Sequence, residues 1–191
     1  MAEIRAFIAV KIDERIREMA ASLQRTLNRG DSRVKWVETN NLHLTLKFLG
    51  DIPEDNLPLY YQALERGASD FSPFKVTFQG LGAFPNLKRP RVLWMGVREG
   101  KEKLSALSKS ISSSLVQASL LEEKELKSNR FSPHLTLGRV RSQKNLEDIM
   151  EILKDKQNIL VGTMEINQIH LIKSTLTPKG PHYEALKNFS L

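Results

Sequence analysis

Two of the four histidines in this chain are followed by the same three residues. The tetrapeptides are His43-Leu44-Thr45-Leu46 and His134-Leu135-Thr136-Leu137. From average residue usage, a given histidine is followed by Leu-Thr-Leu with a probability of about one in a thousand or less. The repeat therefore indicates an internal duplication or a chemical task that both copies share.

The residue types in the repeat are suited to acid–base chemistry at a phosphate. Histidine titrates near neutral pH, so one imidazole can deprotonate a nucleophile while the other protonates a leaving oxygen. In a β-strand, His43 and Thr45 share one face, as do His134 and Thr136, while the leucines face the core. The threonine hydroxyls can then donate to phosphate oxygens. If the two polar faces line one cleft, the site needs no metal.

Three other interpretations compete with this one. A single His-x-Thr in a strand is most often a structural histidine, and the repetition argues against that role. Two histidines could bind a transition metal, but such sites usually add a third protein ligand, and no Asp, Glu or His stands at a suggestive spacing. We therefore expect no metal and no cofactor. A module that binds a phosphate-bearing ligand without turnover remains the alternative function. His170 and His182 lack the threonine and are expected to be structural and at the surface, respectively.

Hydrophobic patterns place both copies of the repeat in strands. The first half of the chain predicts, in order, a strand at 5–12, a helix at 13–27, strands at 34–37 and 42–49, a helix at 54–68 and a strand at 74–81. The second half predicts a strand at 91–97, a helix at 101–121, a polar connector at 122–129, the repeat strand before Gly138, a helix at 146–153 and one or two strands at 159–171.

This order predicts an α+β fold of two pseudo-symmetric lobes. Each lobe is expected to be a small, mostly antiparallel sheet backed by helices, with the active site in the cleft between the lobes. We expect residues 1–191 to form a single bilobal domain. The lobe boundary is placed near residues 82–90, whose composition is typical of a loop, and the terminal strands are free to cross between lobes.

Composition limits the class of protein and its partners. The hydrophobic fraction of 40% and the charged fraction of 27% are typical of a globular protein. The absence of cysteine excludes disulfides and thiolate metal sites. No stretch approaches the roughly 20 apolar residues that span a bilayer, so a cytoplasmic protein without a membrane partner is expected. The net charge of +7 favours a phosphate-bearing partner. Internal symmetry supplies both halves of the site, so we expect a monomer.

With these residues placed, the sequence resembles the 2H phosphoesterase superfamily. The resemblance is greatest to its RNA 2′,3′-cyclic phosphodiesterases, once called 2′–5′ RNA ligases. It covers the whole chain and rests on both tetrapeptides together with Arg5-Ala6-Phe7-Ile8-Ala9, Trp36-Val37, Gly82-Ala83-Phe84-Pro85, Pro90-Arg91-Val92-Leu93-Trp94, Phe131-Ser132-Pro133, Gly138-Arg139-Val140, Ser174-Thr175-Leu176 and Gly180-Pro181-His182-Tyr183.

The resemblance implies hydrolysis of 2′,3′-cyclic phosphate ends of RNA, or of small cyclic nucleotides, to 2′-phosphomonoesters without a metal. Reverse 2′–5′ ligation is implied as a side activity, and the alternative is a non-catalytic module that binds RNA ends or 2′–5′-linked oligonucleotides. Carried over from the family, His43 is the proton donor to the departing 3′ oxygen and His134 is the proton acceptor from water. The residues alone leave open which histidine is the acid and which is the base. Arg139 matches the family's phosphate-binding arginine, beside Thr45 and Thr136.

Strict alternation raises a geometric question for the remaining candidates. It puts Arg139 on the face opposite His134, so Arg139 reaches a phosphate only if the strand ends or bulges at Gly138. It also puts Lys47 on the face of His43, where its charge would add to the cleft. Phe7 lies opposite the apolar face of its strand and is a candidate for stacking on a base. Phe7 and Lys47 are therefore the candidates for base or cleft contacts.

Overall fold

Strands and helices alternate along the chain much as the hydrophobic pattern predicts. The computed structural model describes residues 2–29, 31–128, 131–178 and 180–191. The strands are β1 (Glu3–Lys11), β2 (Val34–Trp36), β3 (His43–Pro53), β4 (Phe74–Phe84), β5 (Val92–Glu99), β6 (His134–Val140), β7 (Leu160–Ile166), β8 (Gln168–Thr177) and β9 (Gly180–Ser190). The helices are α1 (Glu14–Leu27), α2 (Leu57–Ala68), α3 (Lys101–Gln117), α4 (Lys124–Ser128) and α5 (Glu147–Asp155), with short 3₁₀ turns at Thr39–Asn41 and Glu54–Asn56.

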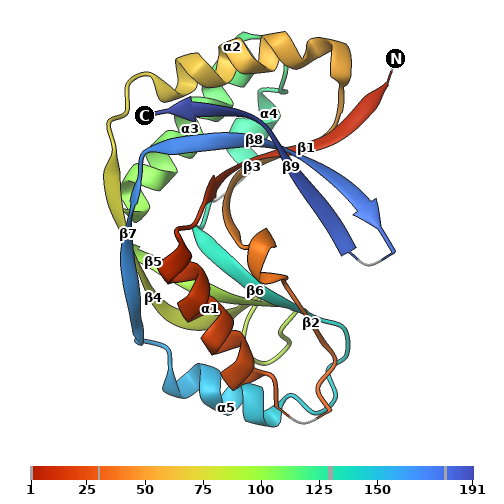
Figure 1. Cartoon of the computed structure of the whole chain (residues 1–191), viewed down its shortest axis with the longest axis vertical. Coiled ribbons are helices and arrows are strands. Elements are labelled where there is room, and N and C mark those ends of the chain that lie inside the picture. The colour runs from red at the N-terminus through yellow and green to blue at the C-terminus, as the bar shows by residue number, and fades with distance from the viewer. Residues whose placement is uncertain (1, 30, 129–130, 179) are drawn as a thin grey trace.

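The strands join in one antiparallel sheet of order β7-β4-β5-β6-β3-β1-β8-β9, and β2 adds to β6. The motif strands β3 and β6 are neighbours at its centre, where Leu44 pairs with Leu135. We call β3, β1, β8 and β9 the β1 half, and β6, β5, β4, β7 and β2 the β4 half. The two halves curve around a concave side that opens to the right in Figure 1.

The predicted α+β fold with a mostly antiparallel sheet is present, but its halves are not successive in sequence. Residues 82–90 end β4 and lead into β5, which pairs with β4 from Phe84 opposite Val92 onward. This loop therefore connects two strands of one half, where the prediction placed the lobe boundary. The C-terminal strands β8 and β9 return to the β1 half. Two strands can pair their backbone hydrogen-bonding groups whether or not they are adjacent in sequence. Hydrophobic periodicity therefore does not show which strands pair.

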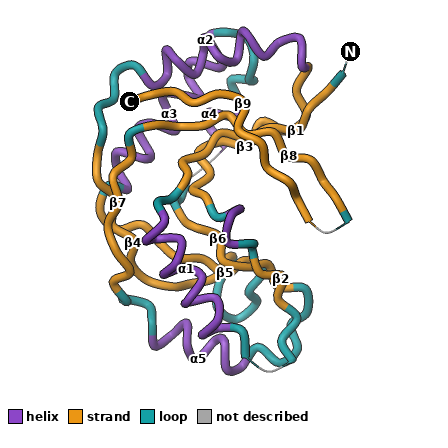
Figure 2. Tube along the Cα trace, in the orientation of Figure 1, coloured by secondary structure: helices purple, strands orange, loops and turns teal. Residues whose placement is uncertain are grey.

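Two helices cross from one half of the sheet to the other. Helix α1 follows β1, yet it packs on β6, β7 and α5 of the β4 half. Helix α3 follows β5, yet it packs on α2 and β3 of the β1 half. Figure 2 shows α2 and α3 beside one half and α1 and α5 beside the other. The start of α1 is fixed by Asp13, whose Oδ1 accepts from the Ile16 amide at 2.8 Å.

One large core on the convex side joins the two halves. The motif leucines belong to it, as predicted, and each is 3% exposed or less: Leu44, Leu46, Leu135 and Leu137. A second, small cluster of Phe7, Ala9 and Ile172 lies apart from this core, with Tyr183 packed against it. Because Phe7 and Ala9 alternate with the core residues of β1, this cluster lies on the concave face.

Three local features differ from the sequence prediction. Helix α3 ends at Gln117, and the polar connector contains α4, while residue 129 lies outside the described residues. Strand β9 was not predicted, because most of its residues are exposed or half-buried. None of the described helices is long and apolar enough to cross a membrane.

Candidate active site

The two tetrapeptides meet at the centre of the sheet. Leu44 pairs with Leu135, and continuing this antiparallel register by one residue sets His43 beside Thr136 and Thr45 beside His134. All four polar side chains are half-buried, opposite the buried leucines. Each histidine thus lies next to the threonine of the other motif. The structure therefore brings both His–Thr pairs together, on neighbouring strands of one sheet.

The histidine rings are held in the same way. Nδ1 of His43 lies 2.7 Å from the carbonyl oxygen of Asn41, and Nδ1 of His134 lies 2.7 Å from that of Ser132. Since a carbonyl only accepts, each Nδ1 carries a proton and donates it. Each Nε2 is then the nitrogen that exchanges protons with a substrate. It accepts when the ring is neutral and donates when the ring is protonated.

Both histidines are less basic than usual. Burial lowers the pKa of His43 below its usual value near 6.5, and the charges of Arg139 and His134 lower it further, against a hydrogen bond to Asn41 that raises it. Burial likewise lowers the pKa of His134, and Arg139 adds to the effect, against the bond to Ser132. The free protein therefore holds both rings mainly neutral at pH 7, and a bound phosphate anion raises both pKa values.

A bulge brings Arg139 to the concave side. In the β5–β6 ladder, Leu93 pairs with Gly138 and Trp94 with Thr136, so Leu137 is an extra residue on β6. A bulge reverses the alternation of the side chains that follow it. Arg139 is exposed, and its charge lowers the pKa of both motif histidines. The bulge that the sequence required for a phosphate-binding Arg139 is thus present, at Leu137–Gly138.

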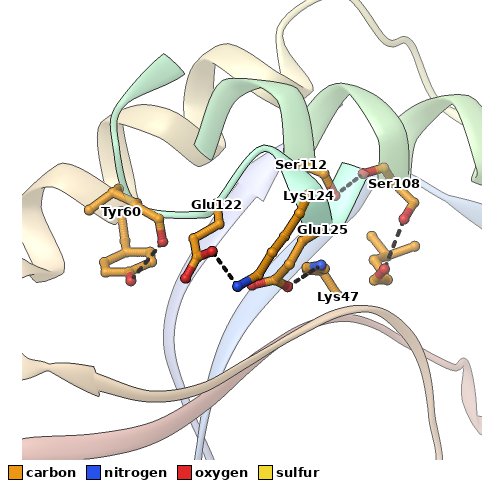
Figure 3. Close-up of polar contacts among 9 residues, drawn as sticks. Lys47, Tyr60, Ser108, Ser112, Glu122, Lys124 and Glu125 are labelled. Carbon is orange, nitrogen blue, oxygen red and sulfur yellow. Dashed lines mark hydrogen bonds and ion pairs between the residues drawn. The ribbon is translucent and has the colours of Figure 1, made fainter. Parts of the chain in front are cut away.

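The same bulge in β3 overturns the predicted position of Lys47. Ile8 pairs with Lys47 and Ala9 with Thr45, so Leu46 is the extra residue. Lys47 consequently turns to the convex side, where it is 7% exposed and its Nζ lies 2.9 Å from Glu125 Oε2 of α4 (Figure 3). Strict alternation, which placed Lys47 beside His43, was wrong because it ignored the bulge. Phe48 takes the concave position.

The burial of Lys47 leads to a prediction about stability. We expect Glu125→Gln to lower the free energy of unfolding by about 3 kcal/mol, because it leaves a buried ammonium without its carboxylate. Lys47→Met should cost less than about 1.5 kcal/mol, because an apolar chain of similar length fills the same space. Urea unfolding of both variants and of the double variant measures the difference. A larger loss for Lys47→Met than for Glu125→Gln would contradict this account.

Aromatic rings surround His43. The ring centroids of Phe7 and Tyr183 lie 4.8 and 5.4 Å from that of His43. Phe7 is on the concave side, as predicted, but it is only 3% exposed, so it supports the His43 ring and offers no open face to a base. The open ring is Phe48, which is 65% exposed and 6.1 Å from Phe7. The sequence signal for Phe48 is its place five residues after His43, which corresponds to that of Arg139 after His134.

A small cavity of about 200 Å³ lies beside His134. Phe84 and Trp94 form part of its wall, and the Phe84 ring meets that of His134 edge-on at 4.9 Å. Trp94 packs so closely on Gly82 that a Cβ there would lie 2.4 Å from the indole ring. Only glycine fits at position 82, which keeps Trp94 against the sheet. This cavity can hold a small group next to the reacting phosphate.

The other two histidines take no part in this site. His170 is 3% exposed, and its Nδ1 lies 2.7 Å from Asn188 Oδ1. His182 is exposed on β9. Over the described ranges of the chain, no three or more His, Asp or Glu side chains are grouped so that they could hold a metal ion.

The fold and the paired motifs define a family. The model of the 2′-5′ RNA ligase superfamily matches residues 7–177. The chain belongs to this superfamily, the 2H phosphoesterases, and the resemblance stated from the sequence is confirmed.

Several relatives extend over the full chain. The RNA 2′,3′-cyclic phosphodiesterase of Methanothermobacter thermautotrophicus is 37% identical over 189 residues, which cover 99% of this chain and 100% of the relative. That of Archaeoglobus fulgidus is 40% identical over 186 residues, which cover 97% and 99%. The crystal structure of TT0787 from Thermus thermophilus matches with a TM-score of 0.81 and 30% identity over 98% of both chains. Escherichia coli LigT complexed with NADP⁺ has the same fold, with a TM-score of 0.74 and 22% identity over 100% of this chain and 99% of that one. The predicted fold class is thereby confirmed.

Proposed function

We propose that this protein hydrolyses the 2′,3′-cyclic phosphate at an RNA end to a 2′-phosphomonoester, without a metal, with His43 as acid and His134 as base. The observation that carries the proposal is the pair of rings whose Nδ1 atoms are both held by backbone carbonyls at 2.7 Å. Two Nε2 atoms are thereby available to one site that Arg139 also faces. The names of the full-length relatives support the same activity.

The reaction follows from the positions of these groups. Arg139 and the hydroxyls of Thr45 and Thr136 hold the cyclic phosphate and stabilise the charge that grows on its oxygens. A water opposite the 3′ oxygen attacks phosphorus while Nε2 of His134 takes its proton. The bond from phosphorus to the 3′ oxygen breaks as Nε2–H of His43 protonates that oxygen. The product keeps the phosphate on the 2′ oxygen, and exchange with water restores both histidines.

The two rings have similar aromatic neighbours. Tyr183 meets the His43 ring edge-on at 5.4 Å, Phe84 meets the His134 ring edge-on at 4.9 Å, and Phe7 lies 4.8 Å from His43. We therefore assign His43 as the acid and His134 as the base from the pattern of the family, and a substrate with a changed leaving group tests this assignment.

Basic side chains continue from Arg139 along the edge of the β4 half. Lys35 of β2 lies opposite Arg139 in the ladder, and the Arg141 amide donates to the Arg33 carbonyl at 2.7 Å. These four side chains are exposed, and three of them, Lys35, Arg139 and Arg141, share one strand face. This row fits the spaced charges of a phosphodiester backbone. We infer that RNA ends, more than mononucleotides, are the substrate.

This row gives a prediction that separates RNA from small substrates. Lys35→Glu combined with Arg141→Glu is expected to raise KM for a cyclic-ended oligonucleotide about tenfold or more at low salt, because it removes backbone contacts. KM for a 2′,3′-cyclic mononucleotide should change little. Steady-state kinetics at two salt concentrations measures both. Equal effects on the two substrates would contradict the proposed RNA path.

We also propose an oligomeric state and a cellular location for this activity. One chain supplies both histidines and both threonines, so we propose that the protein acts as a monomer and as a single domain. We place it in the cytoplasm, with its RNA substrates. Ligation is proposed as a side activity, in which the 5′-hydroxyl of a second RNA replaces water, the bond from phosphorus to the 3′ oxygen breaks and a 2′–5′ linkage forms. The same two histidines would move the protons, while water dominates as nucleophile.

The proposed function is tested by product analysis. The protein is incubated with an RNA oligonucleotide that ends in a 2′,3′-cyclic phosphate, in excess EDTA, and the product is assigned by ³¹P NMR. A 2′-phosphate is expected. Binding without any product would support the alternative, a module that only holds RNA ends. Product formed only when EDTA is absent would show that a metal takes part.

A further inference from the structure

The bulges at Leu46 and Leu137 are each bonded by one buried side chain. In β3 the extra residue is Leu46, and its carbonyl oxygen accepts from Ser108 Oγ at 2.8 Å. In β6 the extra residue is Leu137, and its carbonyl oxygen accepts from Gln24 Nε2 at 2.8 Å. The two carbonyls occupy the same position, three residues after His43 and His134.

The two donors also come from corresponding elements. Ser108 is on α3 and Gln24 is on α1, the helices that cross from one half of the sheet to the other. Both side chains are buried, at 6% and 8% exposure. A buried polar group costs stability unless it is hydrogen-bonded, and a bulge leaves its own carbonyl outside the regular ladder. The helices therefore supply a side-chain donor to the carbonyl of each of these bulges.

The bond from Gln24 is part of a larger arrangement. Its Nε2 also donates to the Val37 carbonyl at 2.7 Å, and the Val37 amide donates to the Leu137 carbonyl at 2.9 Å. Gln24 thus joins the end of β2 to the bulge of β6. At the other bulge, Ser108 itself accepts at its backbone carbonyl from Ser112 Oγ at 2.8 Å (Figure 3).

The bulges decide which side chains reach the substrate. From the motif histidine onward, the six residues of each strand show the same burial order, with the residue at the fifth position after it exposed. That residue is Arg139 in β6 and Phe48 in β3. Without the bulge, alternation would turn Arg139 to the convex side and return Lys47 to the concave side.

We propose that Gln24 and Ser108 are paired positioning residues, which hold the bulges of the two motif strands and so keep Arg139 and Phe48 on the side of the histidines. This inference rests on the proposed function only for its kinetic consequences. Neither residue touches the reacting phosphate. Gln24 acts through Arg139, and Ser108 acts through the strand that carries His43 and Phe48.

The first test replaces Gln24 by methionine, which has a similar shape and no donor. The Gln24→Met variant is expected to lower kcat/KM for the cyclic-ended oligonucleotide about tenfold or more, since small displacements of catalytic groups are costly. Loss of the bulge should also move the Arg139 side chain away from the two histidines. The pKa values of His43 and His134 should then rise, which NMR titration of the ring protons measures. A matched control is Ile16→Val, a buried change on the same helix that removes no hydrogen bond.

A double-mutant cycle separates positioning from stability. In an Arg139→Gln background, Gln24→Met should change neither the histidine titrations nor kcat/KM further, because the group through which it acts is already absent. Equal effects of Gln24→Met in both backgrounds, or titrations that match those of Ile16→Val, would overturn the assignment. The NMR titrations need no turnover, so they test the positioning role even if the proposed function is wrong. A failure of the proposed function would appear separately, because the wild-type protein would then form no product.

Ser108 gives a second test that does not depend on the Gln24 variant folding. Ser108→Ala should lower kcat/KM several-fold, and Ser108→Thr, which keeps the hydroxyl, should restore much of it. Ser112→Ala is the matched control, because it removes a buried hydroxyl bond of the same 2.8 Å length from the same helix without touching the bulge. The same loss for Ser108→Ala and Ser112→Ala would contradict the proposal.

Discussion

Replacing either motif histidine by alanine should lower kcat/KM by about 10²–10⁴-fold, the usual contribution of a positioned general acid or base. The reason is that each Nε2 has its own proton to move, one from water and one to the 3′ oxygen. Since both act in one step, the double variant His43→Ala/His134→Ala should lose much less than the product of the two single losses. Single-turnover hydrolysis of a cyclic-ended oligonucleotide measures these effects.

The control for this prediction is His182→Ala, which removes an exposed histidine of the same chain. It should retain full activity. Circular dichroism and thermal unfolding should show that the two motif variants keep the fold, because both rings are only half-buried. Activity above a tenth of wild type in either motif variant would be incompatible with a two-histidine mechanism.

The second large effect is expected from Arg139→Gln. Loss of one charged phosphate contact should lower kcat by about 10²–10³-fold, as for other donors to a developing oxyanion. The same change should move the pH profile of kcat/KM. Arg139 lowers the pKa of both histidines. Its removal should therefore raise both pKa values and shift both limbs of the profile to higher pH.

The structure also predicts the pH range in which kcat/KM of the wild-type protein is greatest. The reactive free enzyme carries one protonated and one neutral ring, so kcat/KM is greatest between the two pKa values. Burial and Arg139 lower both below their usual value near 6.5. We expect the wild-type maximum below pH 6.5, with activity lost at higher pH as the acid loses its proton. Arg139→Lys keeps the charge and should keep this position. An unchanged profile in Arg139→Gln would contradict the proposed location of the arginine.

The sequence was sufficient for the residues that alternate regularly. His43 and Thr45 alternate with Leu44 and Leu46, and the repeat of this pattern in the second copy identified the face that carries the chemistry. The helix at 13–27 was equally clear from the spacing of its apolar residues. In these segments, local propensity and burial lead to the same structure.

The remaining features depend on contacts that are distant in sequence. The bulge at Leu46 moves Lys47 to the convex side and Phe48 to the concave side, and its donor, Ser108, lies on α3. Gln24, on α1, bonds a carbonyl 113 residues away. A bulge reverses which face of the sheet the following side chains occupy, without a strong change in residue composition. The alternation of residue types alone therefore does not reveal the bulge. The requirement that Arg139 reach the phosphate was the one available signal.

The most direct test of the two-histidine mechanism uses a substrate whose bridging 3′ oxygen is replaced by sulfur. A thiolate leaves without protonation, so the acid becomes unnecessary while the base is still required. We expect His43→Ala to regain most of the activity of wild type on this substrate, and His134→Ala to remain inactive. Recovery of His134→Ala in place of His43→Ala would reverse the two roles, and no recovery of either variant would contradict acid catalysis by this pair.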